Sequence, residues 1–333
     1  MPIPDPPTNL VDFCQMFPSA EECAEYLFQI RWTKGFVCPR CGERSGYSIP
    51  IRKTVECSNP ACRHQTSITA GTVLHRAKQS LHTWFWAAYL VTNLTPSISA
   101  KQFQEQLGIK SYETAFCMLH KLRSALVAPG RDRLHGEIEV DEGYIGGKEE
   151  GCIGRGSMEK QLVVGAVELL RWFDPKTQQA RVRCGRVRLQ VIPNASGNYL
   201  KKFVTGNVER GSSIFTDGWK GYSFLLGAGY HHEAQIKSAK DESLPHFHRV
   251  ISNLKTWLLG TYHGGVQAKH LPAYLNEFTF RFNRRFLSGK AFNRALGLAT
   301  ELEGPTYEDL YHAGKRGRWK HPVGRVQLEG KQA

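Results

Sequence analysis

Apolar positions recur at helical spacing in the first third of the chain. Residues 8–31 space Phe13, Phe17, Tyr26 and Ile30 as one face of a helix, with Thr8 or Asn9 as its cap. Residues 80–127 predict further helices that begin after Ser80, Ser99 and Ser111. A short helix, a turn at Leu107-Gly108-Ile109 and a second helix are typical of a helix-turn-helix. An ordinary helical hairpin gives the same pattern.

From Glu137 onward the pattern changes to alternation and β-branched runs, which are typical of strands. This order predicts a mixed sheet in which the first three strands are antiparallel and the first and fourth are neighbours. The segment from residue 291 is rich in glycine and basic residues and is expected to be a tail. The predicted elements are strands at 137–147, 160–170 and 180–192, a helix at 196–208, a strand, a turn and a helix within 212–229, and a long helical segment at about 245–285.

Four of the nine cysteines form two close pairs, Cys38 with Cys41 and Cys57 with Cys62. Two residues lie inside the first pair, four inside the second, and fifteen between the pairs. A disulfide framework is disfavoured by the odd total of cysteines and by the absence of a secretory signal. Four thiolates close the tetrahedral shell of a structural zinc ion. The spacing therefore predicts a zinc ribbon whose metal has no open position for catalysis.

Composition points to a polyanionic partner. The 333 residues include 44 Lys and Arg against 30 Asp and Glu, a formal net charge of +14. This excess favours nucleic acid, ahead of an acidic membrane surface or of charge that serves only solubility. The most apolar stretch, which begins at Trp84, is much shorter than the about 20 residues that span a bilayer. A cytoplasmic location is therefore expected.

Two aspartates, Asp141 in the first predicted strand of the sheet and Asp217 at the end of the fourth, are 76 residues apart. If those strands are neighbours, the two carboxylates meet. Neighbouring carboxylates repel unless a cation lies between them, and oxygen ligands suit Mg²⁺ or Mn²⁺. Two such ions about 4 Å apart support phosphoryl transfer. A strand aspartate and an Asp-Gly turn are also common outside active sites, so the residues alone leave both interpretations open.

Five segments carry a resemblance to a known family. The chain resembles bacterial insertion-sequence transposases of the ISXO2-like type, which join an N-terminal zinc ribbon to an RNase H-like catalytic domain. The matching segments span most of the chain between about residues 20 and 290. They are CPRCG with the second cysteine pair, EVDEGYIGGKE at 139–149, FTDGWKGY at 215–222, HRVISNLKTWLLGTYHG at 248–264 and HLPAYLNEFTFRFNRR at 270–285.

The resemblance implies that Asp141 and Asp217 are the first two members of an acidic triad. The wider superfamily has Glu at the third position, whereas no Asp or Glu occurs here between Glu242 and Glu277. In this branch the third position looks variable, with Glu, Asn or His followed seven residues later by Lys.

Lys255 fits that lysine, which makes His248 the expected third ligand, with Asn253 as second choice. Lys255 is then expected to contact a phosphate or to orient the attacking oxygen, although an ordinary surface lysine is the alternative. Glu277 is a possible replacement ligand, but its distance from Asp217 in the sequence assigns it to a later helix.

The predicted fold class is multidomain α+β, with an RNase H-like α/β catalytic domain built on a mixed sheet. Its predicted parts are an N-terminal helix at 1–30, a zinc ribbon at 31–76, a helix-turn-helix-like DNA-binding region at 77–130, the catalytic domain at 131–290 and a basic tail at 291–333. Basic residues in these parts are expected to contact DNA: Lys110, Lys121, Arg123, Lys148, Arg281, Arg284 and Arg285.

The resemblance implies a DNA transposase that contains structural zinc and uses Mg²⁺ or Mn²⁺. It would hydrolyse a phosphodiester at each element end and transfer the freed 3′-hydroxyl into target DNA. Its expected partners are terminal inverted repeats, target DNA and at least one further copy of the chain, in a nucleoid-associated complex. The rival interpretation is a DNA-binding protein without catalysis, either a regulator or a decayed transposase. A nuclease that cleaves without strand transfer is a third.

Overall fold

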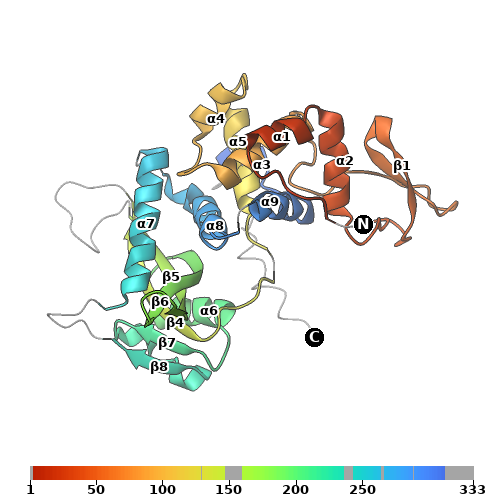
Figure 1. Cartoon of the computed structure of the whole chain (residues 1–333). Helices are drawn as coiled ribbons and strands as arrows, with labels where there is room; N and C mark the ends of the chain where they lie inside the picture. The colour runs from red at the N-terminus through yellow and green to blue at the C-terminus, as the bar shows by residue number, and fades with distance from the viewer. Residues whose placement is uncertain are drawn as a thin grey trace. The chain divides into compact units, whose positions relative to one another are not determined.

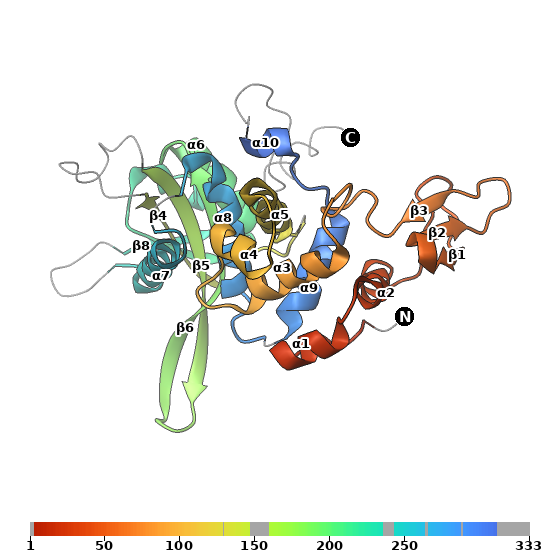
Figure 2. The same ribbon diagram turned by 90° about the horizontal axis from the view of Figure 1, so that it is seen from above.

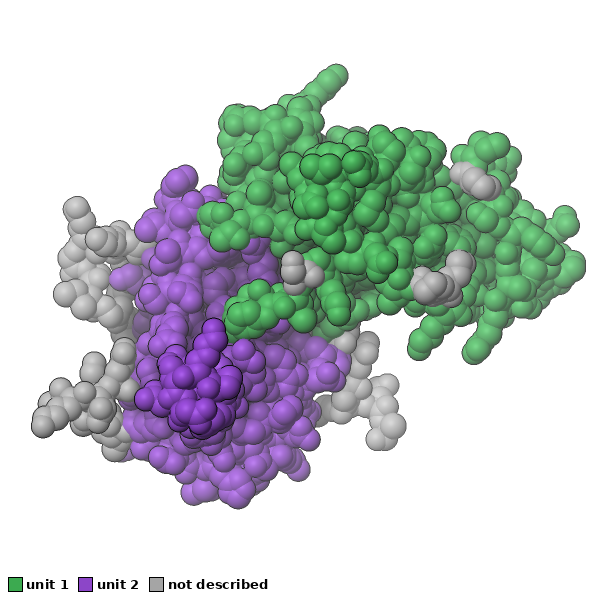
Figure 3. Space-filling model, in the orientation of Figure 1, with its two compact units in different colours: residues 1–128, 284–322 green, residues 129–283, 323–333 purple. Residues whose placement is uncertain are grey.

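The computed structural model describes residues 3–128, 130–146, 160–235, 243–263, 266–287 and 289–311. The chain divides into two compact units (Figure 3). Unit 1 contains residues 1–128 and 284–322, and unit 2 contains residues 129–283 and 323–333. None of the helices in the described ranges has the length and hydropathy that crossing a membrane requires.

Unit 1 begins with two helices, α1 (Leu10–Met16) and α2 (Ala20–Arg31). The predicted single helix over 8–31 is therefore wrong. The helix is interrupted where Pro18 lacks an N–H and Ser19 caps α2 by accepting a hydrogen bond from the Glu21 N–H. The four paired cysteines follow in a small antiparallel sheet of β1 (Gly46–Ile49), β2 (Thr54–Cys57) and β3 (Gln65–Ser67), with a 3₁₀ turn η1 (Pro50–Arg52) between β1 and β2.

Three more helices of unit 1 start where the sequence predicts. They are α3 (Leu81–Asn93), α4 (Ala100–Gln106) and α5 (Tyr112–Ala125). Ser80, Ser99 and Ser111 each accept a hydrogen bond from the backbone N–H three residues later, so all three predicted caps are confirmed.

The segment after residue 290 is not only a basic tail. Helix α9 (Lys290–Glu301) buries Phe292, Leu296 and Leu298, and α10 (Tyr307–Tyr311) follows it. Phe292 joins an aromatic cluster with Phe13, Phe17 and Phe85. The apolar face of α9 thus completes the core of unit 1, a role that the basic composition of the segment conceals.

Unit 2 is built on a five-stranded sheet of order β6-β5-β4-β7-β8 (Figure 1). Strand β4 pairs antiparallel with β5 and parallel with β7, and β5 pairs antiparallel with β6. The predicted antiparallel arrangement of the first three strands and the adjacency of first and fourth are confirmed, as is the multidomain α+β class. The strands are β4 (Glu137–Ile145), β5 (Gln161–Asp174), β6 (Gln179–Ile192), β7 (Ser213–Thr216) and β8 (His231–Ala234).

Helices cover both faces of this sheet. One core packs α6 (Gly197–Asn207) against one face, and a second packs α7 (Pro245–Tyr262) and α8 (Leu271–Phe282) against the other. The predicted long helix at 245–285 is in fact broken after His263, and η4 (Ala268–His270) precedes α8. The predicted helix after β7 is replaced by two 3₁₀ turns, η2 (Lys220–Tyr222) and η3 (Leu226–Ala228).

Gly165 on β5 lets α7 approach the sheet. A Cβ at this position would lie 2.8 Å from Phe247 Cε2 and 2.9 Å from Leu189 Cδ2. The first turn of α7 therefore rests on Gly165, which is the cross-strand partner of Asp141.

We expect Gly165→Ala to lower the free energy of unfolding by about 1–3 kcal/mol, because the added methyl group has no room. Denaturant unfolding measures this. Gly227→Ala is the matched control, since nothing lies within 4 Å of its added Cβ, and it should change stability by less than about 0.5 kcal/mol. Equal stabilities for both variants would contradict the tight contact.

Candidate functional site

The four paired cysteines of unit 1 converge on one point. The Sγ atoms of Cys38, Cys41, Cys57 and Cys62 all lie within 4.8 Å of one another, with 3.5 Å between Cys41 and Cys57 and 3.9 Å between Cys38 and Cys62. Tetrahedral zinc with Zn–S bonds of about 2.3 Å places its sulfurs about 3.8 Å apart. The thiols therefore fit structural zinc without rearrangement.

Backbone turns present these thiols. Gly42 has φ +78, and its N–H donates to the Cys38 carbonyl, which closes the first turn. In the second turn the Cys62 N–H donates to the carbonyl of Asn59, whose side chain accepts from the Ala61 N–H. The zinc ribbon expected from the cysteine spacing is present in the geometry.

In unit 2, strand pairing brings Asp141 and Asp217 to neighbouring positions. The parallel register joins Ile138 with Ile214 and Glu139 with Phe215. The pairing ends there, and Asp217 directly follows Thr216, the last residue of β7. Asp217 is close enough for its charge to act on Asp141. Residues in register on parallel strands point to the same face. Glu139 and Phe215 therefore face α7, and Asp141, two residues after Glu139 on β4, shares that face.

The surroundings of the two carboxyls differ. Asp141 is buried and Asp217 is exposed. Burial, reinforced by the negative charge of Asp217, raises the pKa of Asp141 to about 7, although its carboxylate accepts a 2.7 Å hydrogen bond from the Glu142 N–H. Burial and a neighbouring negative charge both disfavour the ionised form of a carboxyl group, and a bound cation stabilises that form. The oxygen donors of this pair are of the type that Mg²⁺ and Mn²⁺ take.

A buried glutamate fixes the start of α7 on this face. Glu139 lies on β4 two residues before Asp141, with its side chain 3% exposed. Its Oε2 accepts a 2.6 Å hydrogen bond from the Phe247 N–H, and its Oε1 lies 2.9 Å from Nδ1 of His246. A carboxylate at a helix N-terminus is stabilised by the unpaired N–H groups there. Sequence patterns gave no signal for this contact, because Glu139 and Phe247 are 108 residues apart.

Helix geometry fixes which side of α7 carries the predicted third ligand. Trp257 contacts Phe278 of α8, with ring centroids 5.8 Å apart, and α8 packs on β6. At about 100° per residue, His248 projects about half a turn away from Trp257, and Lys255 projects close to His248. Both therefore project from the side of α7 opposite to Trp257 and α8. Asn253 lies on the Trp257 side.

The three predicted metal ligands of unit 2 do not form a compact cluster in the structure. Within the described ranges, the four cysteines are the single group in which three or more potential ligand atoms lie within 4.8 Å of one another. His248 is half-buried, and Lys255 and Asn253 are exposed. Glu277 is fully buried on α8 and forms an ion pair with Arg281 at 3.9 Å. Because α8 packs on β6, Glu277 lies toward the opposite edge of the sheet from β7, the strand that Asp217 follows.

The residues of the α4–α5 region that are predicted to contact DNA differ in their exposure to solvent. Lys110 is exposed in the turn, and Lys121 is half-buried with a pKa lowered by burial. For Arg123 the prediction is wrong, because its side chain is fully buried and donates a 2.9 Å hydrogen bond to the Ile98 carbonyl. Most of α5 packs into the core, and its exposed part is the N-terminal turn around Tyr112 and Glu113.

The remaining predicted DNA contacts lie in or beside α8. Arg281 is half-buried on this helix. Burial, and then the charge of Arg294, lower the pKa of Arg284 to about 10. Arg285 is exposed and lies over the ring of Phe286 at 4.6 Å. Lys148 falls outside the described residues.

Comparison with known proteins agrees with this architecture. Residues 133–283 match the family model of the ISXO2-like transposase domain, and residues 18–65 match that of the transposase zinc-ribbon domain. The chain is also 25% identical, over 283 residues, to a Halobacterium salinarum protein called "Uncharacterized protein in transposable element ISH50". That alignment covers 80% of this chain and 91% of the relative.

The ribbon, the sheet domain and these similarities together support a transposase role. Unit 2 is thus similar to the ISXO2-like transposase domain, and the ribbon is similar to the transposase zinc ribbon.

We expect Cys38→Ser to lose about one equivalent of zinc and to destabilise the ribbon, because metal binding and folding are coupled in such modules. Elemental analysis of the purified chain and its thermal unfolding measure the two effects. The control is Cys14→Ser, which changes an exposed cysteine outside the cluster and should retain the parent zinc content. Unchanged zinc content in Cys38→Ser would overturn the four-cysteine assignment.

Proposed function

We propose that unit 2 catalyses both chemical steps of transposition at the Asp141–Asp217 site. In the first step, water attacks the phosphorus at an element end, the bond to the 3′ oxygen breaks, and that oxygen takes up a proton to leave a 3′-hydroxyl. In the second step, this hydroxyl attacks a phosphodiester of target DNA, so one ester bond forms as another breaks. Neither step needs a nucleotide cofactor, and the sequence contains no P-loop motif.

The parallel register of β4 and β7 is the observation that carries this proposal. Because β4 and β7 are parallel neighbours, Asp141 on β4 and Asp217 just after β7 can approach each other, and the charge of Asp217 adds to the effect of burial on the pKa of Asp141. Asp141 and Asp217 would hold divalent cations, with His248 as third donor. Such cations stabilise charge on the attacking and leaving oxygens.

The side chains on the outer face of α7 would position the substrate. Lys255 lies two turns after His248 on the same side of the helix, and its exposed ammonium group can donate hydrogen bonds to a non-bridging phosphate oxygen. Glu139 fixes the start of α7 and so sets the height of His248 above the sheet. At least two copies of the chain would act together, because two element ends must be cut and joined.

We expect Asp141→Asn and Asp217→Asn each to slow metal-dependent cleavage about a thousandfold, since each loses a charged ligand worth several kcal/mol in the transition state. Nicking of a labelled duplex that carries the element end, with Mg²⁺ or Mn²⁺, measures this. Asp141→Asn should be at least as stable as the parent, because burial already disfavours the charged form. Its loss of activity therefore cannot reflect unfolding.

The control for the aspartate variants is Glu233→Gln, which changes a carboxylate on β8 and should cleave at the parent rate. Cleavage by either Asn variant at the parent rate would remove that aspartate from the site. If the parent binds DNA but never cleaves it with either metal, the non-catalytic interpretation prevails.

We expect His248→Ala to reduce cleavage sharply and to raise the Mn²⁺ concentration needed for half-maximal rate, whereas His248→Glu should retain part of the activity because a carboxylate can replace the imidazole as ligand. Metal titrations of the cleavage rate measure both. Asn253→Ala is the matched control on the same helix and should behave as the parent. Full activity of His248→Ala would exclude His248 from the site.

A further inference from the structure

Strands β5 and β6 continue beyond the sheet as an isolated two-stranded ribbon. The pairing of β5 with β4 ends at Leu169, whereas β5 and β6 stay paired from Leu170 with Arg183 to Asp174 with Gln179. Figure 2 shows this hairpin projecting from the other strands of unit 2. We call residues 170–183 the arm. In the described part of the chain, the backbone pairing of these two strands is with each other alone, and at the base of the arm Arg171 forms a 2.9 Å ion pair with Glu137 of β4.

The arm exposes large apolar side chains next to positive charge. Leu170, Trp172 and Phe173 are 37%, 40% and 58% exposed. The cross-strand partners of Leu170 and Trp172 are Arg183 and Arg181, so these four side chains share one face. The arm as a whole has a single acidic residue, Asp174, and four basic ones: Arg171, Lys176, Arg181 and Arg183.

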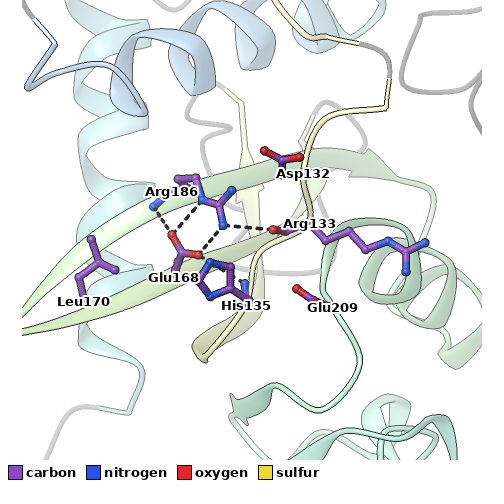
Figure 4. A pocket seen from close by; sticks show the side chains of 7 residues that line it. All are labelled: Asp132, Arg133, His135, Glu168, Leu170, Arg186 and Glu209. Atoms are coloured by element: carbon purple, nitrogen blue, oxygen red, sulfur yellow. Dashed lines mark hydrogen bonds and ion pairs between the residues drawn. The ribbon is translucent and has the colours of Figure 1, made fainter.

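A bulge and an ion pair at the base of the arm fix its direction relative to the sheet. Gly185 and Arg186 form a bulge opposite Glu168, and a Cβ at Gly185 would lie 2.9 Å from both Glu168 Oε2 and Leu170 Cγ. Buried Glu168 accepts hydrogen bonds from Arg186 Nη2 at 2.7 Å and Nε at 3.0 Å, and Arg186 Nη2 also donates to the Arg133 carbonyl (Figure 4). A paired buried charge of this kind is costly to break, so the bulge and its ion pair set the angle of the arm.

An open pocket of about 590 Å³ lies at this base. Leu170 lines it from the arm, and Arg133 and His135 line it from the segment before β4 (Figure 4). Leu170 also belongs to the face with Trp172, Arg181 and Arg183. Leu170 therefore connects this face of the hairpin with the pocket, whose lining includes basic residues (Arg133, His135 and Arg186) and acidic ones (Asp132, Glu168 and Glu209).

The chemistry of this face favours a nucleic acid over a second protein chain. Exposed aromatic residues on an isolated ribbon indicate a binding surface, and the surplus of arginine makes two such arms repel each other. The major groove of B-DNA admits a two-stranded β-ribbon, and arginine binds both phosphate and guanine edges. Arg181 is 48% exposed in its 3.3 Å ion pair with the buried Asp174, so its guanidinium group is accessible to a phosphate from the solvent side.

We propose that the arm is a duplex-DNA-binding element, which lays its Trp172–Arg181–Arg183 face against the groove and backbone of the DNA that unit 2 acts on. This inference rests on the proposed function only in taking DNA as the substrate. The proposed DNA contacts of the arm are separate from the Asp141–Asp217 site.

Site-specific photocrosslinking tests which molecule binds to the arm. The full chain with p-benzoylphenylalanine in place of Trp172 is irradiated with a labelled duplex of the element end and with an unrelated duplex of equal length. No Mg²⁺ or Mn²⁺ is added, so the result does not depend on cleavage. The control places the same photoreactive residue at Tyr199, an exposed aromatic position on α6.

We expect a protein–DNA adduct from position 172 and none from position 199. An adduct between two protein chains at position 172, or no adduct there, would overturn the proposal. If the catalytic proposal alone fails, the protein with the crosslinker at position 172 still forms a DNA adduct, but the parent protein does not cleave DNA when metal is added.

A charge comparison tests the arginines. Arg181→Gln with Arg183→Gln should weaken duplex binding about tenfold or more and reduce the slope of log K against log salt by about two, because two phosphate contacts are lost. Lys201→Gln with Lys202→Gln removes two exposed charges from α6 and should change affinity less than about twofold. Equal losses in both double variants would mean that net charge alone acts, and would overturn the arm's role.

Discussion

The parallel pairing of β4 with β7 is the constraint on which the catalytic unit depends. It joins two strands separated by a β-hairpin and a helix, and it brings the end of β7, which Asp217 follows, next to the strand that contains Asp141. A slip of one residue would send one carboxyl to the opposite face, among the side chains that pack on α6. The apolar residues of both cores oppose such a slip, because Ile138, Val140 and Ile214 are buried on the α6 side. The packing that stabilises the sheet thus also sets the spacing of the two acids.

Helix α7 covers the face of the sheet opposite to α6 through both polar and apolar contacts. At its start, Glu139 accepts a hydrogen bond from the helix N-terminus, and Phe247 packs where Gly165 leaves room. Further along, Ile251 packs against Gly143 on β4. Two glycines and one glutamate therefore determine how closely the helix approaches the strand that contains Asp141. His248 and Lys255 project from the opposite side of α7 to Trp257, whose ring contacts Phe278 of α8.

Unit 1 has a different physical basis. Its ribbon is short, with strands of three or four residues, and its four thiols meet as a metal shell requires. The helical part has a large aromatic core that the chain completes only with α9, about 160 residues after α5. The basic charge that suggested DNA binding is therefore spread over surfaces in both units, and part of it, as in Arg123, is internal.

The sequence by itself determined the local features. The cysteine spacing predicted the ribbon, the three serine caps predicted α3, α4 and α5, and alternation predicted the first three strands of the sheet. These signals are readable because capping, turn geometry and strand alternation act between residues close in the chain. The break at Pro18 and the separation of α7 from α8 were missed, since an apolar pattern can continue across a turn.

Only the tertiary structure decided which distant groups meet. The contact of Glu139 with α7, the burial of Arg123, the burial of α9 and the free-standing β5–β6 ribbon arise from packing between segments far apart in the chain. A periodic pattern tells that a side chain is apolar or charged and on which face of its own element it lies. It does not tell what the fold brings against that face, because contact depends on the path of the whole backbone.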